Sequence, residues 1–160
     1  MAARPAPGNP DVVTQDRAGP GPGGEPDISV RIYRPVGLDG PLPGIYFIHG
    51  GGMVLGTVAG EDATATLVCD EVKAVVVSVE YRLAPEHPHP APVEDCYAGL
   101  VWMAEHADEL GIDPERVAIY GGSAGGGLAI GTALLARDRS GRRLSFMMPL
   151  YPMIADTNTT

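Results

Sequence analysis

Ser123 stands among glycines in the segment 117–127, VAIYGGSAGGG, and its position indicates chemistry. Residues 121–125 fit the pattern Gly-x-Ser-x-Gly, in which a serine occupies a tight turn between a strand and a helix. Glycine suits the flanking positions because the backbone is pinched there and a Cβ atom would clash with neighbouring elements. The pattern alone is weak in a chain with 22 glycines, but an apolar run precedes the serine and a helical pattern follows it. This context predicts that Ser123 is a nucleophile.

A second glycine-rich segment, FIHGGGMVLG, places His49, Gly50, Gly51 and Gly52 directly after an apolar run typical of a buried strand. Glycines leave backbone N–H groups unobstructed, so such a loop can donate hydrogen bonds to the oxyanion of a tetrahedral intermediate. We expect donors from Gly51 and Gly52, with Gly50 as a further candidate, to act with the N–H of Ala124. The alternative is an ordinary glycine-rich turn, but two improbable motifs in the correct order favour an oxyanion hole.

Apolar runs predict the strands that would position these residues. Alternation from Ile28 onward is typical of a half-buried strand, whereas nearly continuous apolar runs suit central strands that are buried on both faces. The continuous runs lie at 44–50 and 73–81, and 117–120 and 144–152 are predicted to form a fourth and a fifth strand.

Helical periodicity fills the intervals between the strands. Apolar residues at helical spacing predict helices over 61–72 and 93–110, the second ending near Gly111, and a further helix follows Ser123. Strands and helices alternate from residue 44 onward, so the predicted fold class is α/β, with a mainly parallel sheet and helices on both faces.

The segment 1–27 differs in composition from the rest of the chain. It is rich in proline and glycine and carries few apolar residues, which predicts a flexible arm with at most one edge strand near 11–17. The remaining residues, 28–160, are predicted to form one domain, since a chain of 160 residues is long enough for a single core.

Charge and composition argue against several classes of partner. The chain has 11 Lys and Arg against 20 Asp and Glu, and its net charge of −9 would repel nucleic acid and anionic lipid. No apolar run approaches the roughly 18 residues that a membrane span needs, and the N-terminus lacks a secretory signal pattern. Cys69 and Cys96 have no metal or disulfide spacing. These features predict a cytoplasmic protein with no nucleic-acid partner and no membrane span.

A third segment, 80–102, is on its own a proline-rich loop leading into a helix. Together the three segments resemble the hormone-sensitive lipase family of α/β-hydrolases, the carboxylesterase branch that includes arylacetamide deacetylases. The resemblance spans about 27–160, the first half or so of that family's catalytic domain. The motifs that carry it, in the family's order, are His49-Gly50-Gly51-Gly52, Tyr81-Arg82-Leu83-Ala84-Pro85-Glu86 and Gly121-Gly122-Ser123-Ala124-Gly125-Gly126.

The resemblance implies a serine carboxylesterase that needs no metal or cofactor and hydrolyses short- to medium-chain acyl esters through an acyl-enzyme on Ser123. Gly51, Gly52 and Ala124 would form the oxyanion hole, and His49 would support the oxyanion loop rather than act as the general base. The sequence departs from the family at Gly122, where relatives usually carry an acidic residue, so we expect a looser turn.

A serine of this kind needs an imidazole to accept its proton and an acid to orient that imidazole. In α/β-hydrolases the acid and the histidine follow the serine in the chain, but all four histidines here precede Ser123. The only downstream acids, Asp138 and Asp156, do not match the family's acid position. His87 and His89 are expected to be exposed in the proline-rich loop, and His106 to be solvated on a helix surface. We therefore expect the base to lie outside these 160 residues.

An incomplete hydrolase would lack the C-terminal strands and the cap, so its last strand, 144–151, would be an apolar edge open to self-association. A non-catalytic ligand-binding protein on the same scaffold, as in the gibberellin receptors of plants, remains a second interpretation. A third, a nucleotide-phosphate loop, would need the spacing Gly-x-Gly-x-x-Gly, which residues 50–52 do not have.

Overall fold

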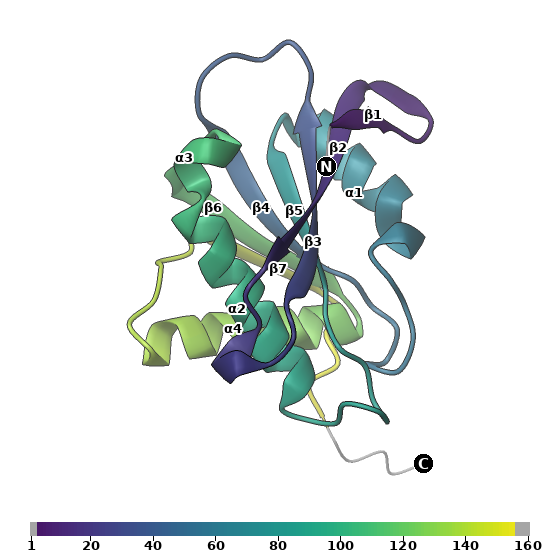
Figure 1. Ribbon diagram of the computed structural model, residues 1–160, viewed down its shortest axis with the longest axis vertical. Coiled ribbons are helices and arrows are strands. Elements are labelled where there is room, and N and C mark those ends of the chain that lie inside the picture. The colour runs from purple at the N-terminus through teal and green to yellow at the C-terminus, as the bar shows by residue number, and fades with distance from the viewer. Residues whose placement is uncertain (1–2, 156–160) are drawn as a thin grey trace.

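Seven strands form one mixed sheet in the computed structural model of the chain, which describes residues 3–155 (Figure 1). Their order across the sheet is β1-β2-β3-β5-β4-β6-β7. The pairs among β5, β4, β6 and β7 are parallel, and the pairs from β1 to β5 are antiparallel. The strands are β1 (Arg4–Ala6), β2 (Asn9–Gly19), β3 (Ile28–Pro35), β4 (Leu42–Ile48), β5 (Val75–Glu80), β6 (Ile112–Gly122) and β7 (Phe146–Leu150).

Helices cover both faces of the sheet, as expected (Figure 1). Helix α1 lies on one face, and α2, α3 and α4 lie on the other. Within residues 3–155, no helix has the length and apolar character needed to cross a membrane. The helices are α1 (Asp62–Val72), α2 (Ala91–Glu105), α3 (Ala107–Leu110) and α4 (Ala124–Asp138), with short 3₁₀ turns η1 (Pro22–Gly24) and η2 (Ala59–Glu61).

The strand β5 shows why the sheet is buried on both sides. Val75, Val77 and Val79 pack into the core beneath α2 and α4, whereas Val76 packs into the core beneath α1. All four are fully buried, and complete burial of such a side chain contributes about 1.5–3 kcal/mol. The continuous apolar runs of the sequence therefore correspond to central strands, as predicted.

The expectation of a flexible arm over 1–27 is wrong for most of its length, although the strand expected around 11–17 is present within β2. Strand β2 pairs with β3 from Val12 opposite Pro35 to Gly19 opposite Ile28, and β1 pairs with β2 in turn. Val12 is completely buried. Composition predicted too little order because it does not count the backbone hydrogen bonds that β3 offers to a neighbouring strand.

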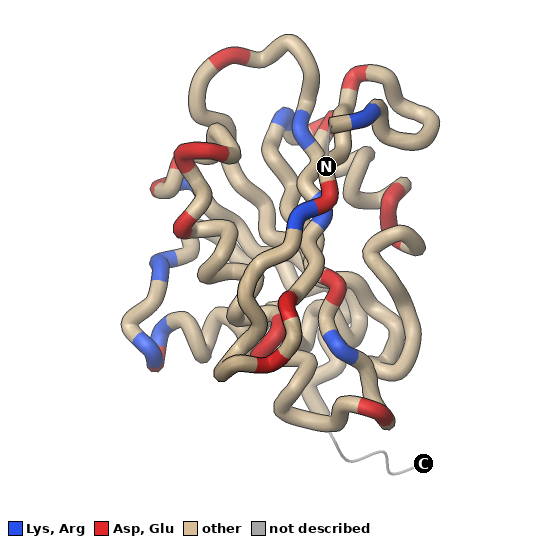
Figure 2. Tube along the Cα trace, viewed as in Figure 1, with Lys and Arg blue, Asp and Glu red and all other residues tan. Residues whose placement is uncertain are grey.

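A charged cluster on β2 and β3 joins the N-terminal strands to α1. Figure 2 shows basic and acidic residues side by side in this region. Arg31 Nε lies 2.6 Å from Asp16 Oδ1, and its Nη1 lies 2.9 Å from Asp62 Oδ1. The hydrogen bond from Arg31 lowers the pKa of the Asp16 carboxyl, and the same bond raises the pKa of Arg31. The cluster thereby favours the position of α1 over this face.

Strand β7 lies at one end of the sheet and leaves apolar side chains exposed. Its only strand neighbour within residues 3–155 is β6, so its other edge presents backbone N–H and C=O groups without a ladder. Phe146 is 60% exposed, and in the segment that follows Tyr151 is 79% exposed and Ile154 is 77% exposed. The described residues thus contain the open apolar edge that the sequence predicted.

We predict that the chain self-associates through β7 and the segment after it, and that Phe146→Lys weakens this association. A lysine on an edge strand opposes pairing with a second copy because it carries charge into the contact. Light scattering at micromolar concentration measures the effect, with Leu67→Lys as the control, since Leu67 is 59% exposed on α1. A monodisperse unmodified monomer would contradict the prediction.

Candidate active site

Ser123 lies at the turn between β6 and α4, and its backbone is held in an unusual conformation. Its φ of 55° and ψ of −119° lie outside the regions that non-glycine residues normally occupy. The turn is braced by the last residue of β7 and by the segment that follows: Ser123 N–H donates to Leu150 O at 3.0 Å, and Ser123 O accepts from Met153 N at 2.9 Å. The side chain of Ser123 remains exposed, so the turn presents its hydroxyl to solvent.

Gly125 allows α4 to approach the carboxyl end of β4. A Cβ atom there would overlap the carbonyl oxygen of Ile48 and would lie 2.6 Å from that of His49. Gly122 is different, because a Cβ atom there would meet only the ring of Tyr151, at 3.4 Å from its hydroxyl. A side chain therefore fits at position 122. The expected looseness of the turn at Gly122 stays a prediction.

The loop from His49 to Val58 follows β4 and presents backbone N–H groups. Gly51 has a φ of 116°, and its carbonyl oxygen accepts hydrogen bonds from Leu55 N at 2.9 Å and Val54 N at 3.2 Å. The carbonyl oxygen of Gly50 lies 2.8 Å from His49 Nδ1, which must carry the proton because a carbonyl only accepts.

These acceptors decide where the neighbouring N–H groups point. In a planar trans peptide the N–H points opposite to the preceding C=O. The N–H groups of Gly51 and Gly52 therefore point away from the donors that hold the carbonyl groups of Gly50 and Gly51. No hydrogen bond within residues 3–155 uses either N–H as a donor. Ala124 begins α4, where the first N–H groups of a helix have no partner inside the helix.

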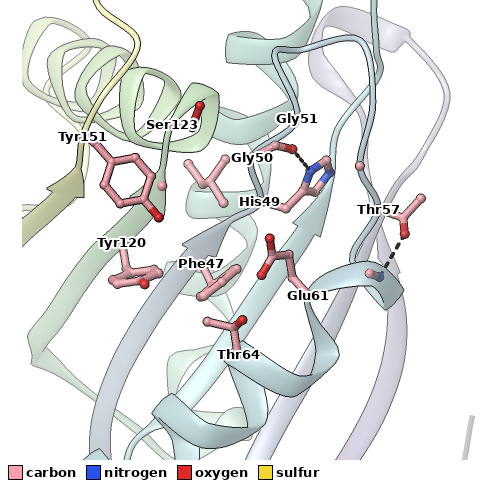
Figure 3. Close-up of a pocket in the computed structure, with 14 residues that line it drawn as sticks. Phe47, His49, Gly50, Gly51, Thr57, Glu61, Thr64, Tyr120, Ser123 and Tyr151 are labelled. Atoms are coloured by element: carbon pink, nitrogen blue, oxygen red, sulfur yellow. Dashed lines mark hydrogen bonds between the residues drawn. The ribbon is translucent and has the colours of Figure 1, made fainter.

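One cavity of about 410 Å³ joins Ser123 to this loop (Figure 3). Its walls include Phe47 and Tyr120, whose rings stack with centroids 4.9 Å apart, and Tyr151. Burial raises the pKa of Tyr120, and the nearby charges of Tyr151 and Glu61 raise it further. The residues lining the cavity are Phe47, Ile48, His49, Gly50, Gly51, Gly56, Thr57, Gly60, Glu61, Thr64, Tyr120, Gly122, Ser123 and Tyr151.

The structure brings some of the predicted site residues together in the cavity, but not all of them. Ser123, His49, Gly50 and Gly51 line the cavity, whereas Gly52 lies one residue further along the loop and Ala124 is buried at the start of α4. The aromatic and acidic wall residues were not predicted. Tyr120 and Tyr151 do follow from topology, since they stand at the carboxyl ends of the adjacent parallel strands β6 and β7, where sites of α/β proteins form.

His49 is the only histidine of the described residues that lines the cavity. It is buried, and its ring is hydrogen-bonded to the carbonyl oxygen of Gly50. Its Nε2 lies 3.8 Å from the Glu80 carboxylate. His87 and His89 are exposed, as expected. His106 differs from the expectation, because it is half-buried against Trp102, with ring centroids 4.5 Å apart.

The two downstream acids give no partner for Ser123 within the described residues. Asp138 ends α4 and pairs with its neighbour Arg137 at 2.7 Å, and it does not line the cavity. Asp156 lies outside the described residues.

Comparison with known proteins decides the family. Residues 45–160 match a family described as alpha/beta hydrolase fold. The chain belongs to the α/β-hydrolases, in the branch that resembles hormone-sensitive lipase. As an α/β-hydrolase it has the expected fold, and the strand–turn–helix arrangement predicted around Ser123 is confirmed.

Relatives of this hydrolase are named as esterases. Carboxylesterase NlhH of Mycobacterium tuberculosis is 47% identical over 126 residues, which cover 79% of this chain and 40% of the relative. Carboxylic ester hydrolase LipN of the same organism is 52% identical over 122 residues, covering 76% and 32%.

Solved structures agree with this assignment. A bacterial heroin esterase matches with a TM-score of 0.84 at 45% identity, over 86% of this chain and 44% of that protein. A hyperthermophilic esterase from Pyrobaculum calidifontis matches with a TM-score of 0.84 at 44% identity, over 91% and 46%. The chain thus spans less than half the length of these relatives.

We predict that Gly125→Ala lowers the free energy of unfolding by about 1–3 kcal/mol, the usual cost of overpacking, because the new Cβ collides with backbone rather than with a movable side chain. Urea unfolding followed by circular dichroism measures it. Gly131→Ala in the same helix is the control, since its Cβ meets only a methyl group of Val93 at 3.1 Å and alanine favours helix. Equal urea midpoints for the two variants would contradict the prediction.

Proposed function

We propose that this chain carries the nucleophile and oxyanion hole of a serine carboxylesterase that acts on short- to medium-chain acyl esters. The observation that supports it most directly is Ser123 itself, an exposed hydroxyl on a strained strand-to-helix turn. It shares one cavity with the glycine loop, where the N–H groups of Gly51 and Gly52 have no acceptor among residues 3–155. The esterases among the relatives support the same reaction class.

In the proposed acylation step, Ser123 Oγ attacks the ester carbonyl carbon, and its proton passes to a general base. The carbonyl π electrons move to the oxygen, which becomes an oxyanion. Collapse of the tetrahedral intermediate releases the alcohol, which takes the proton from the base. Water then attacks the acyl-enzyme by the same sequence and releases the acid.

The developing oxyanion needs donors that are already oriented, because such donors reorganise little during the reaction. We assign this role to the N–H groups of Gly51, Gly52 and Ala124, with Gly50 beside them. The orientation of the Gly51 and Gly52 N–H groups is fixed before substrate binds, since the carbonyl groups of Gly50 and Gly51 are held by hydrogen-bond donors. His49 acts as a support for this loop.

The general base is assigned to a histidine outside the 160 residues, oriented by an acid that also lies outside them. The four histidines of this chain support that assignment by their positions: His49 is buried and engaged, and the other three do not line the cavity. Full turnover is therefore proposed for a longer polypeptide, in which Ser123→Ala should lower kcat by roughly 10⁴-fold or more.

For this chain we predict slow acylation of Ser123 by p-nitrophenyl acetate that free imidazole or 2-methylimidazole accelerates. The cavity is open beside Ser123 and can admit a small base to accept the hydroxyl proton. Mass spectrometry of the peptide that contains Ser123 measures the acetyl group directly and so avoids counting the hydrolysis that imidazole catalyses by itself.

Ser123→Ala is the matched control and should remove the acetyl group from that peptide. Base-dependent acylation at Ser123 would support the proposal. The proposal would be overturned if the Ser123→Ala variant were acetylated on this peptide as much as the unmodified chain, or if no acetylation occurred at any base concentration. Tight binding of an ester without acylation would favour a ligand-binding protein on the same scaffold.

A further inference from the structure

Tyr81 lies directly behind the glycine loop, on the side away from the cavity. It follows β5, and its ring stacks on the imidazole of His49 with centroids 4.2 Å apart and planes 16° apart. Its hydroxyl donates to the carbonyl oxygen of His49 at 3.0 Å and lies 3.5 Å from that of Gly50. Only 2% of Tyr81 is exposed. The sequence motif that begins at Tyr81 has no role in the chemistry assigned so far.

The two hydrogen bonds behind the loop act on consecutive peptide groups. Tyr81 Oη holds the carbonyl of His49, and His49 Nδ1 holds the carbonyl of Gly50. Each planar trans peptide turns its N–H opposite to its C=O. The first bond therefore sets the direction of the Gly50 N–H, and the second sets that of the Gly51 N–H.

We propose that Tyr81 is a positioning residue for the reaction: its hydroxyl and ring hold His49 and the His49 carbonyl, and thereby aim the loop N–H groups at the oxyanion. Tyr81 does not touch the substrate, because the loop lies between it and the cavity and it is absent from the cavity lining. The inference rests on the proposed function for its catalytic meaning, but the geometry it describes can be measured separately.

The backbone at Tyr81 is itself fixed from both sides. The buried carboxylate of Asp95 on α2 accepts hydrogen bonds from Arg82 N at 2.9 Å and from Arg82 Nε at 2.8 Å. On the other side, Glu80 Oε2 accepts from Val58 N at 2.9 Å, at the far end of the loop. The residue before and the residue after Tyr81 thus tie it to the loop and to α2.

The tyrosine hydroxyl is suited to a permanent role as donor. Burial raises its pKa well above the ordinary value, and the nearby charges of Cys96 and Glu80 act in the same direction. The hydroxyl therefore keeps its proton across the neutral range. Phenylalanine would keep the stacked ring and remove only the donor, so the two contributions can be separated.

The test compares Tyr81→Phe with Tyr46→Phe. Tyr46 is a matched control, because it is also buried and its hydroxyl donates to a backbone carbonyl, that of Cys96, at 2.8 Å. That carbonyl belongs to α2, and Tyr46 does not line the cavity. Both variants lose one buried hydrogen bond, so both should lose similar thermal stability, while only one should disturb the loop.

The first measurement needs no activity: backbone amide ¹H and ¹⁵N chemical shifts of Gly50 and Gly51 by NMR. We expect both to move in Tyr81→Phe and to stay within error in Tyr46→Phe. Unchanged shifts in Tyr81→Phe, or equal changes in both variants, would overturn the proposal. If Tyr81→Phe does not fold, exchange of the Tyr81 hydroxyl proton with solvent is measured in the wild-type chain instead. We expect slow exchange, and free exchange would overturn the proposal.

The second measurement is the imidazole-dependent acylation of Ser123. We expect Tyr81→Phe to lower the acylation rate constant about 10-fold, less than the 10²–10³-fold loss from deleting an oxyanion donor outright, with little change in the half-saturating ester concentration. Tyr46→Phe should retain the wild-type rate. Moved amide shifts with no acylation in any form of the chain would support the positioning by Tyr81 while overturning the esterase proposal. Moved shifts with an unchanged rate would overturn the catalytic part of the inference.

Discussion

The close approach of α4 to the carboxyl end of β4 is the contact on which the rest of the site depends. Gly125 makes it possible, because a side chain there would run into the carbonyl oxygens of Ile48 and His49. This contact brings the first turn of α4, whose N–H groups have no partner inside the helix, beside the glycine loop. The strained turn at Ser123 persists because it is over-determined by the packing of α4 and by two hydrogen bonds, one donated to Leu150 O and one accepted from Met153 N.

Support for the site is divided between the two faces of the sheet. Tyr81 and Tyr46 belong to the core beneath α2 and α4, and this face holds the backbone of the loop from behind. Phe47 belongs to the core beneath α1, with Tyr120 packed against it, and this face forms the cavity wall. The orientation of the N–H groups therefore depends on Tyr81 and His49. The cavity is shaped instead by Phe47 and Tyr120, although His49 also lines it.

The sequence predicted the elements well where local patterns carry the information. The buried runs became β4, β5 and β6, and the helix after Ser123 begins at Ala124 as expected. Residues 1–27 were misjudged because strand pairing with β3 is a long-range interaction that composition does not record. His106 was misjudged for a different reason: it directly follows α2, and its contact with Trp102 depends on how the two side chains are oriented at the end of that helix. The motifs located Ser123 and the loop, but the peptide orientation in that loop depends on Tyr81, some thirty residues away in sequence.

The residues of the cavity wall can vary without changing the orientation of the loop N–H groups. The direction of the N–H groups is set by donors that hold the carbonyl groups of the same peptides, so it does not depend on the identity of wall residues such as Glu61. Glu61 has no ion-pair partner within residues 3–155, and it faces the cavity between Phe47 and His49 (Figure 3). A change of charge at Glu61 would alter the electrostatic environment of the cavity directly, because the carboxylate is only partly exposed to screening solvent. The wall near α1 can therefore change what binds while the turn at Ser123 and the loop before it keep the same geometry.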